Sequence, residues 1–165
     1  MVLIGGHKRL AYRRRRGFRY ERDLALTLWD KGFACIRGPA SGAGIKRLFY
    51  PDLVAIKNGV ILVIEVKSLR EGGLAKVRKE KLEKMLSFAK RASGGRSKAY
   101  ALLVLKLVRK GWRVLNVEEL IKVQGDKKIY TIKYKDVIRC ADLRGLLEAI
   151  DGTGSLEGFL HCGRP

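Results

Sequence analysis

The sequence is poor in several residue types, and each shortage narrows the class of protein. Its three cysteines, Cys35, Cys140 and Cys162, stand far apart, and none has a cysteine or histidine neighbour at zinc-ligand spacing. We therefore expect neither a zinc site nor a disulfide scaffold, and a reduced intracellular protein. The longest apolar runs, VILVI and YALLVL, have the length of strands and are too short to cross a bilayer. Asn and Gln are also scarce beside many Lys, Arg and Glu, which is typical of a thermophilic protein.

Acidic residues are the minority among the charged side chains. Asp and Glu number 16 against 36 Lys and Arg, which gives a formal net charge of +20. This excess favours a nucleic-acid partner, or less often an anionic membrane surface, because basic side chains release the counterions condensed on phosphates. The alternative is a solvated basic surface, as in ribosomal and thermophilic proteins. The apolar start of MVLIGGHKRL is too short for a signal peptide, so we expect a cytoplasmic, nucleoid-associated protein.

Hydrophobic periodicity predicts one α/β domain, with a mixed central β-sheet flanked by helices. We expect a flexible basic arm at residues 1–14, the domain at 15–150 and a loose tail at 151–165. Residues 38–50 and 68–76 read as loops, because both segments are rich in glycine. Helices are expected at 21–31, 77–92 and 142–150, and strands at 33–37, 52–57, 60–67, 100–108, 112–117 and 128–134.

The segment YPDLVAIKNGVILVIEVK predicts a β-hairpin that carries charged residues at one end. Asn58-Gly59 is the strongest short turn signal, and a two-residue turn fixes the pairing register. Counting outward from that turn places Asp52 directly opposite Glu65. Lys67 follows two residues after Glu65 and therefore lies on the same face of the strand. The register brings two carboxylates and an ammonium to one end of the hairpin.

Two opposed carboxylates on a sheet repel each other unless a cation lies between them. A pair at this spacing suits Mg²⁺, which can polarise a phosphate and lower the pKa of a bound water. Lys67 could orient that water or stabilise the negative charge of the transition state. The hairpin therefore suggests metal-assisted phosphodiester hydrolysis. The alternative is that Asp52 is there only because aspartate is common at the start of a strand, and that Glu65 and Lys67 face solvent.

Asp52, with Pro51 before it, and Glu65-Val66-Lys67 resemble the PD-(D/E)XK nuclease motif. Several further segments resemble the archaeal Holliday junction resolvases, and the likeness covers Arg15 to Val117. These segments are RRGFRYER at 15–22, KGFACIRGPASG at 31–42, FAKR at 88–91 running into Gly94-Gly95, and GWR at 111–113. The sequence from Glu118 onward has no match that we can assign.

The resemblance implies a restriction-endonuclease-like nuclease core and a homodimer with two active sites. Such a dimer would cut four-way DNA junctions by paired nicks in homologous recombination and repair, with Mg²⁺ or with Mn²⁺ as a substitute. It implies that Asp52 and Glu65 bind the metal with Glu21 as an additional acidic ligand, and that Lys67 assists the attacking water. Ser41 would approach the scissile phosphate. The residues implied to hold backbone phosphates are Arg15, Arg16, Arg22 and Arg37.

Some of these residues also have simpler explanations. Glu21 could be a first-turn residue that the helix dipole favours, and the arginine run at 13–16 would help any DNA-binding protein. Phe88 lies off the apolar stripe of its helix, so it is either a dimer contact or a stray surface residue. Lys81 departs from the family pattern, since some members have a polar or acidic group there.

Two rival functions remain open at this point. One is a nuclease of the same fold that acts on linear duplex or flaps. The other is a non-catalytic nucleic-acid-binding module that keeps the motif. A sliding clamp and a branch-migration helicase are candidate accessory partners that the sequence leaves open.

Overall fold

The computed structural model describes residues 5–39, 49–153 and 156, with side chains described from residue 16 onward. In chain order the elements are α1 (Gly5–Asp30), β1 (Ala34–Arg37), β2 (Leu53–Lys57), β3 (Val60–Leu69), β4 (Leu74–Arg78), α2 (Lys79–Ser93), β5 (Lys98–Leu107), β6 (Gly111–Asn116), α3 (Val117–Gln124), β7 (Ile129–Lys133), α4 (Tyr134–Val137) and α5 (Leu143–Thr153). Within these described ranges, no helix has the length and apolar character needed to cross a membrane.

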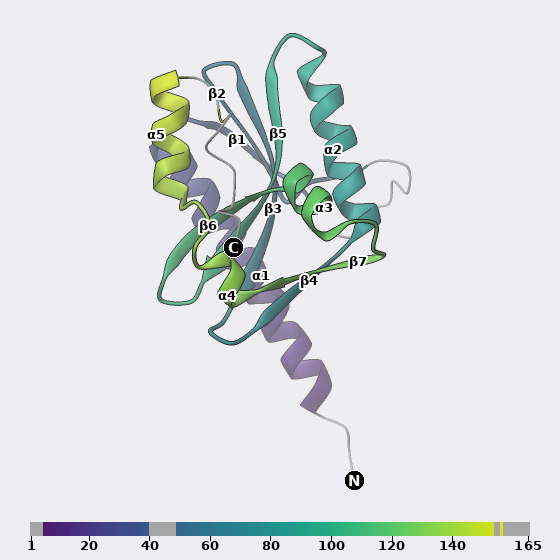
Figure 1. The fold of residues 1–165 in the computed structure, drawn as a ribbon. Helices are drawn as coiled ribbons and strands as arrows, with labels where there is room; N and C mark the ends of the chain where they lie inside the picture. The colour runs from purple at the N-terminus through teal and green to yellow at the C-terminus, as the bar shows by residue number, and fades with distance from the viewer. Residues whose placement is uncertain (1–4, 40–48, 154–155, 157–165) are drawn as a thin grey trace.

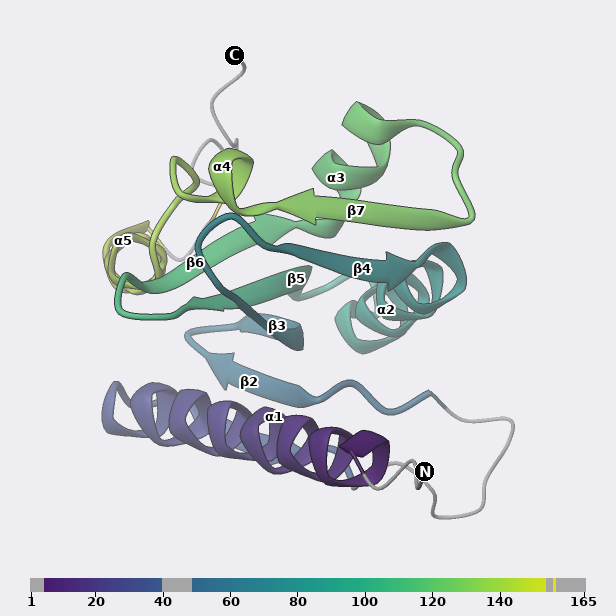
Figure 2. The same ribbon diagram turned by 90° about the horizontal axis from the view of Figure 1, so that it is seen from below.

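The predicted mixed α/β sheet is confirmed. Five strands run in the order β1-β2-β3-β5-β6, and a separate two-stranded sheet joins β4 to β7. Strands β3 and β5 are parallel, while the other pairs of the main sheet are antiparallel. Helices α1 and α5 cover one face, and α2, α3 and the small sheet lie on the other (Figures 1 and 2). Both faces of the central strand β3 are therefore buried.

Alternation along β3 divides the core into two layers. Leu62 and Ile64 point toward α1, where they pack with Leu24 and Leu28. Val63 points to the opposite face, into the layer that α2 completes. The predicted apolar stripe of α2 is Leu82, Met85, Leu86 and Ala89, and it faces the core: three of them are buried, and Leu86 is half-buried against the same layer. Gly94, in the left-handed conformation at φ 52°, ends that helix.

The hairpin has the register expected from its turn. Asn58 and Gly59 both have positive φ, at 51° and 73°, as a type I′ turn requires. Lys57 pairs with Val60, and the ladder continues to the pair formed by Leu53 and Ile64. The next step along both strands brings Asp52 opposite Glu65.

The first helix begins at Gly5, well before the predicted start at Glu21. Residues 5–14, expected to form a flexible arm, are helical turns that project beyond the sheet (Figure 1). The sequence from Lys8 to Arg16 contains Arg, Lys, Leu and Ala, which are strong helix formers. The predicted start relied on the buried stripe, which begins only at Leu24. Residues 1–4 lie outside the described chain, and the division into arm, domain and tail stays a prediction.

The segment 68–76 is not the continuous loop that its glycines suggested. Strand β3 continues to Leu69, and β4 begins at Leu74 and pairs with β7. Helices α3 and α4 were not predicted either. Asn116 caps α3, with its Oδ1 accepting a 2.8 Å hydrogen bond from the N–H of Glu118. At the other end of the chain, α5 runs into the expected tail, where Leu156 is buried.

The cysteines differ in state. Cys35 is a free, half-buried thiol, and burial raises the pKa of that thiol. Cys140 is disulfide-bonded, which the spacing of the cysteines did not predict. A pairing between residues far apart in the sequence leaves no local signal.

Candidate active site

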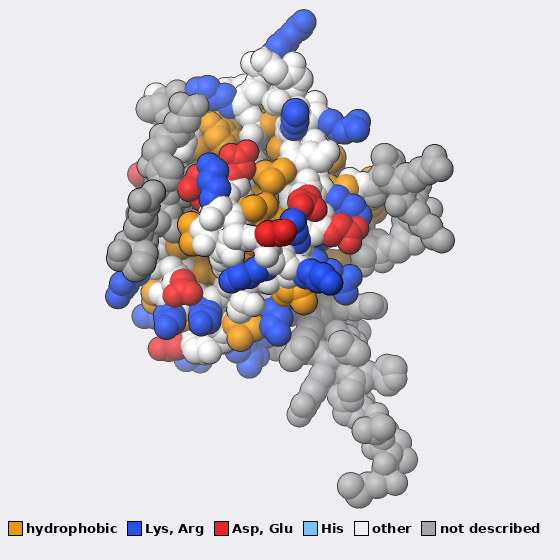
Figure 3. All heavy atoms as spheres, turned by 45° about the vertical axis from the view of Figure 1, so that its right-hand side comes forward, with side chains coloured by type: hydrophobic (Ala, Val, Ile, Leu, Met, Phe, Trp, Pro, Cys, Tyr) orange, Lys and Arg blue, Asp and Glu red, His pale blue; other side chains and the backbone are white. Residues whose placement is uncertain are grey.

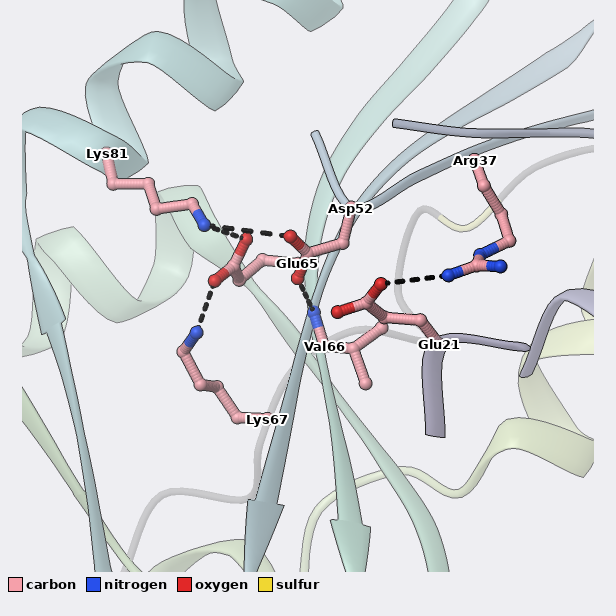
Figure 4. A network of polar contacts seen from close by, with 7 residues as sticks. All are labelled: Glu21, Arg37, Asp52, Glu65, Val66, Lys67 and Lys81. Atoms are coloured by element: carbon pink, nitrogen blue, oxygen red, sulfur yellow. Dashed lines mark hydrogen bonds and ion pairs between the residues drawn. The ribbon is translucent and has the colours of Figure 1, made fainter. Parts of the chain in front are cut away.

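Charged side chains from α1, β3, α2 and the residue before β2 converge beside the end of the hairpin that lies away from its turn (Figure 4). Asp52 directly precedes β2, and Glu65 and Lys67 lie in β3. Lys81 comes from the first turn of α2, and Glu21 from α1. The predicted convergence of Asp52, Glu65 and Lys67 is therefore present in the fold.

A backbone hydrogen bond across the hairpin holds the Asp52 carboxylate. The N–H of Val66 donates to Asp52 Oδ2 over 2.8 Å. The second oxygen, Oδ1, lies 3.8 Å from Lys81 Nζ. The Asp52 side chain is 20% exposed, so it is accessible from one side while its orientation is fixed.

Glu65 is the only charged residue classed as buried in the part of the chain that the structure describes. Its Oε1 accepts a hydrogen bond from Lys67 Nζ. Its Oε2 forms an ion pair with Lys81 Nζ. A buried carboxylate without a positively charged partner would be strongly unfavourable, so the two ammonium groups stabilise the site.

The two carboxylates differ in pKa. Burial, followed by the negative charge of Glu65, raises the pKa of Asp52 to about 7, although Lys81 and the Val66 N–H act in the opposite direction. Burial would also raise the pKa of Glu65, but Lys67 and Lys81 outweigh it and hold this pKa below its ordinary value. Burial opposes the charge on Lys67, but Glu65, Asp52 and Glu21 together raise the pKa of its ammonium. In the folded protein Glu65 is thus the carboxylate that loses its proton first.

Glu21, on α1, lies near this cluster. Its Oε2 pairs with Arg37 Nη2 at 3.4 Å, and its charge acts on Lys67. Among the described residues, no three His, Cys, Asp or Glu side chains gather closely enough to hold a metal ion. Direct metal binding by Glu21 therefore stays a prediction.

The arginines predicted to bind DNA have different surroundings. Arg16 Nη2 donates a 3.4 Å hydrogen bond to Ser68 Oγ, whose side chain points to the opposite face of β3 from those of Glu65 and Lys67. Arg37 lies at the edge of the site, paired with Glu21. Arg22 is exposed on α1. The side chain of Arg15 and the whole of Ser41 lie outside the described residues.

Phe88 is neither a stray surface residue nor free of contacts in its own chain. It is half-buried and makes an edge-to-face contact with Phe49, with ring centroids 6.3 Å apart. Both rings pack against the core layer beneath α2. A role for Phe88 in dimer formation stays a prediction.

Sequence reasoning did not place Lys81 in the site. Its only signal was that it departs from the pattern of the family it resembles. The buried stripe of α2 shows which side of the helix faces the sheet, but not which strand ends lie under its first turn. That relationship depends on how α2 packs on β3 and β5.

The donor set suits a hard divalent cation. Asp52 and Glu65 provide carboxylate oxygens, the ligands that Mg²⁺ prefers, and Mg²⁺ commonly keeps several waters when few protein ligands are available. Both oxygens of the buried Glu65 already have cationic partners, Lys67 at Oε1 and Lys81 at Oε2. The residues therefore fit a metal held by two carboxylates and water.

Comparisons with known proteins agree on one family. The family model described as archaeal Holliday junction resolvase matches residues 12–154 of this chain. Crossover junction endodeoxyribonuclease Hjc of Sulfurisphaera tokodaii is 37% identical over 147 residues, or 88% of this chain and 96% of that protein. Hjc of Archaeoglobus fulgidus is 35% identical over 130 residues, or 79% of this chain and 90% of that protein. The solved structure of Archaeoglobus fulgidus Hjc, titled a Holliday junction resolvase, has a TM-score of 0.64 at 31% identity and covers 79% of this chain and 99% of its own.

Proposed function

The chain belongs to the archaeal Holliday junction resolvase family, and from this we propose that it cleaves four-way DNA junctions in recombination and repair. The observation that carries the proposal is the convergence of Asp52, Glu65 and Lys67 at one end of the hairpin (Figure 4). The net charge of +20 provides the attraction for DNA that such a site requires. We place this activity in the cytoplasm, on chromosomal DNA.

We propose Mg²⁺ as the cofactor, with Mn²⁺ as a substitute, held by Asp52 and Glu65. When bound there, the ion would polarise the scissile phosphate and lower the pKa of a water molecule. The Val66 N–H keeps the Asp52 carboxylate aimed at that position. Burial of Glu65 prevents its carboxylate from turning away into solvent.

Lys67 would act on the attacking water and on the charge that develops at phosphorus. Its ammonium is held against Glu65 Oε1 from the same strand, and its side chain is 33% exposed. It can therefore reach a phosphate that approaches from solvent while staying anchored. Attack in line with the leaving 3′ oxygen would give 5′-phosphate ends.

Arginines beside the site would position the DNA backbone. Arg37 lies at its edge, paired with Glu21, while Arg16 contacts Ser68 and Arg22 is exposed on α1. Figure 3 shows Lys and Arg side chains gathered over the lower part of the face that carries α2. Contacts with phosphates give no information about the base sequence. The selectivity of the enzyme would therefore come from the shape of the branch point. Arg15 and Ser41 keep their proposed roles as phosphate contacts.

We further propose a homodimer, because paired cuts on a two-fold junction require two sites related by a two-fold axis. Strand β1 forms one edge of the sheet with β2 next to it, and α2 packs instead on β3 and β5. Ile36, which is 65% exposed, and Ile56, which is 40% exposed, point outward there on the same side as α2. With Val54, which pairs with Ile36, they form the edge patch, which we propose as the dimer surface together with Phe88 on α2.

The test compares cleavage of a labelled four-way junction with cleavage of linear duplexes that carry the same arms, in Mg²⁺ and in chelator. We expect nicks only in the junction and only with Mg²⁺. Equal cutting of linear duplex or flaps would favour a nuclease with other substrates. Binding without cleavage by the intact protein would favour the non-catalytic module.

A further inference from the structure

The ammonium of Lys81 lies where the carboxylates converge. Its Nζ forms an ion pair with Glu65 Oε2 and lies 3.8 Å from Asp52 Oδ1. It thus contacts one oxygen of each carboxylate, which is the position that a cation shared by the two groups would take. Lys67, in contrast, is hydrogen-bonded to the other oxygen of Glu65 (Figure 4).

The local energetics of α2 do not explain a lysine at this position. Lys81 lies in the first turn of the helix, where the backbone N–H groups make the end partially positive. A cation there is disfavoured, and no side-chain hydrogen bond from Arg78 caps this end. The favourable interactions of Lys81 are therefore those with the two carboxylates.

The Lys81 ammonium can leave while the carboxylates stay. The side chain of Lys81 is 36% exposed and has a flexible four-carbon stem, whereas Glu65 is fully buried. The neighbouring Leu82 is fully buried and fixes the backbone of α2. Only the end of the lysine side chain has to move for another cation to reach both oxygens.

From these contacts we infer that Lys81 is a built-in competitor of the metal ion. It neutralises Asp52 and Glu65 in the metal-free protein, and a divalent cation must displace it to bind. This inference rests on the proposed function, since it takes the metal site as its premise. Lys81 is thus a positioning residue that sets the metal affinity of the site, and no covalent step is assigned to it.

The inference is tested by Mn²⁺ binding to the DNA-free protein at about pH 8, which is above the raised pKa of Asp52. Isothermal titration calorimetry and the electron paramagnetic resonance signal of free Mn²⁺ both report affinity without activity. Lys81→Met removes the charge, keeps the length and adds no oxygen ligand. We expect it to bind Mn²⁺ roughly tenfold more tightly than the wild type. Lys81→Arg, which keeps the charge, should stay close to the wild type.

Lys84→Met is the matched control. Lys84 lies on the same helix and pairs with Glu80 at 2.6 Å, so this variant loses an equal charge away from the site. Its Mn²⁺ affinity should not change. If Lys81→Met binds no more tightly than Lys84→Met, the inference is overturned. Lys81→Ala repeats the test with a shorter side chain, in case methionine fills the site.

A further variant separates this inference from the proposed function. Asp52→Asn should weaken Mn²⁺ binding whatever Lys81 does. If Asp52→Asn weakens binding and Lys81→Met leaves it unchanged, the metal site survives and the role of Lys81 fails. If Asp52→Asn leaves Mn²⁺ binding unchanged, the proposed metal site itself is wrong. Denaturant unfolding with and without Mn²⁺ gives a second readout, because Mn²⁺ should stabilise Lys81→Met more than it stabilises the wild type.

Discussion

The backbone N–H of Val66 donates a 2.8 Å hydrogen bond to Asp52 Oδ2 and so joins the two strands where the carboxylates converge. An aspartate that served only as turn chemistry would bond to the backbone of its own turn. Asp52 bonds instead across the hairpin, to the residue that follows Glu65. The alternative of a solvent-facing Glu65 is also wrong, because its side chain is fully buried.

Replacing Lys67 should impair cleavage more than binding. We expect Lys67→Met to lower the cleavage rate of a four-way junction by about 10²–10⁴-fold, because a group that assists proton transfer or charge development is lost. The dissociation constant for the junction should change little. Single-turnover cleavage and gel-shift binding measure the two effects, with Lys84→Met as control. A rate within a few-fold of the wild type would rule out a direct role for Lys67.

The raised pKa of Asp52 predicts how stability depends on pH in the metal-free protein. This pKa is about 7 in the folded state and near 4 in an unfolded chain. The stabilisation from holding this proton is complete below about pH 4 and is lost as the pH rises through about 7. Asp52→Asn has no proton to lose and its amide oxygen can still accept from Val66. It should therefore gain in stability relative to the wild type over that interval.

Urea unfolding midpoints in chelator, measured across this pH range, test the prediction. Glu83→Gln, which removes an exposed carboxylate of α2, is the control, and its difference from the wild type should vary much less with pH. A flat difference for Asp52→Asn would show that the Asp52 pKa is not raised in the folded protein.

The start of α1 should contribute phosphate contacts. Removing residues 1–14 deletes Lys8, Arg9, Arg13 and Arg14, while the described core packing of α1 begins at Tyr20. Junction binding should weaken, and the slope of log K against log salt should become shallower by up to about 4, at roughly 0.9 per lost contact. Replacing the same four residues by Gln in the full-length chain separates charge from length. An unchanged slope would mean that this segment does not contact DNA.

Charge on the edge patch should produce monomers. Ile36→Asp places a carboxylate on the exposed face of β1, and an apolar contact with a second copy would then be strongly unfavourable. Ile36 is a cleaner choice than Phe88, which also contacts Phe49 in its own chain. Leu26→Asp on α1, at a residue that is 55% exposed, is the control and should remain dimeric. Sedimentation equilibrium distinguishes the outcomes, and a dimeric Ile36→Asp would place the interface elsewhere.

The hairpin and its three charged residues could be predicted because the information is local. Asn58-Gly59 fixes the turn, the turn fixes the register, and the register places Asp52 opposite Glu65. The predicted start of α1 at Glu21 was wrong. Helix propensity, and not a buried stripe, extends the helix back to Gly5.

Long-range packing determines what the sequence could not show. Strand β4 has a partner in β7, where Leu74 pairs with Lys133 from a distant part of the chain. Lys81 likewise reaches the site only because Leu82 and Met85 pack α2 against the sheet. Neither pattern is visible within a short window of sequence.

The most direct test of the central claim is the effect of Asp52→Asn on a four-way junction in Mg²⁺. Binding and cleavage are measured on the same labelled DNA, beside the wild type and Lys84→Met. We predict that Asp52→Asn binds the junction nearly as well as the wild type and leaves it uncut. Cleavage at the wild-type rate would contradict the account, because Asp52 would then not belong to the catalytic site.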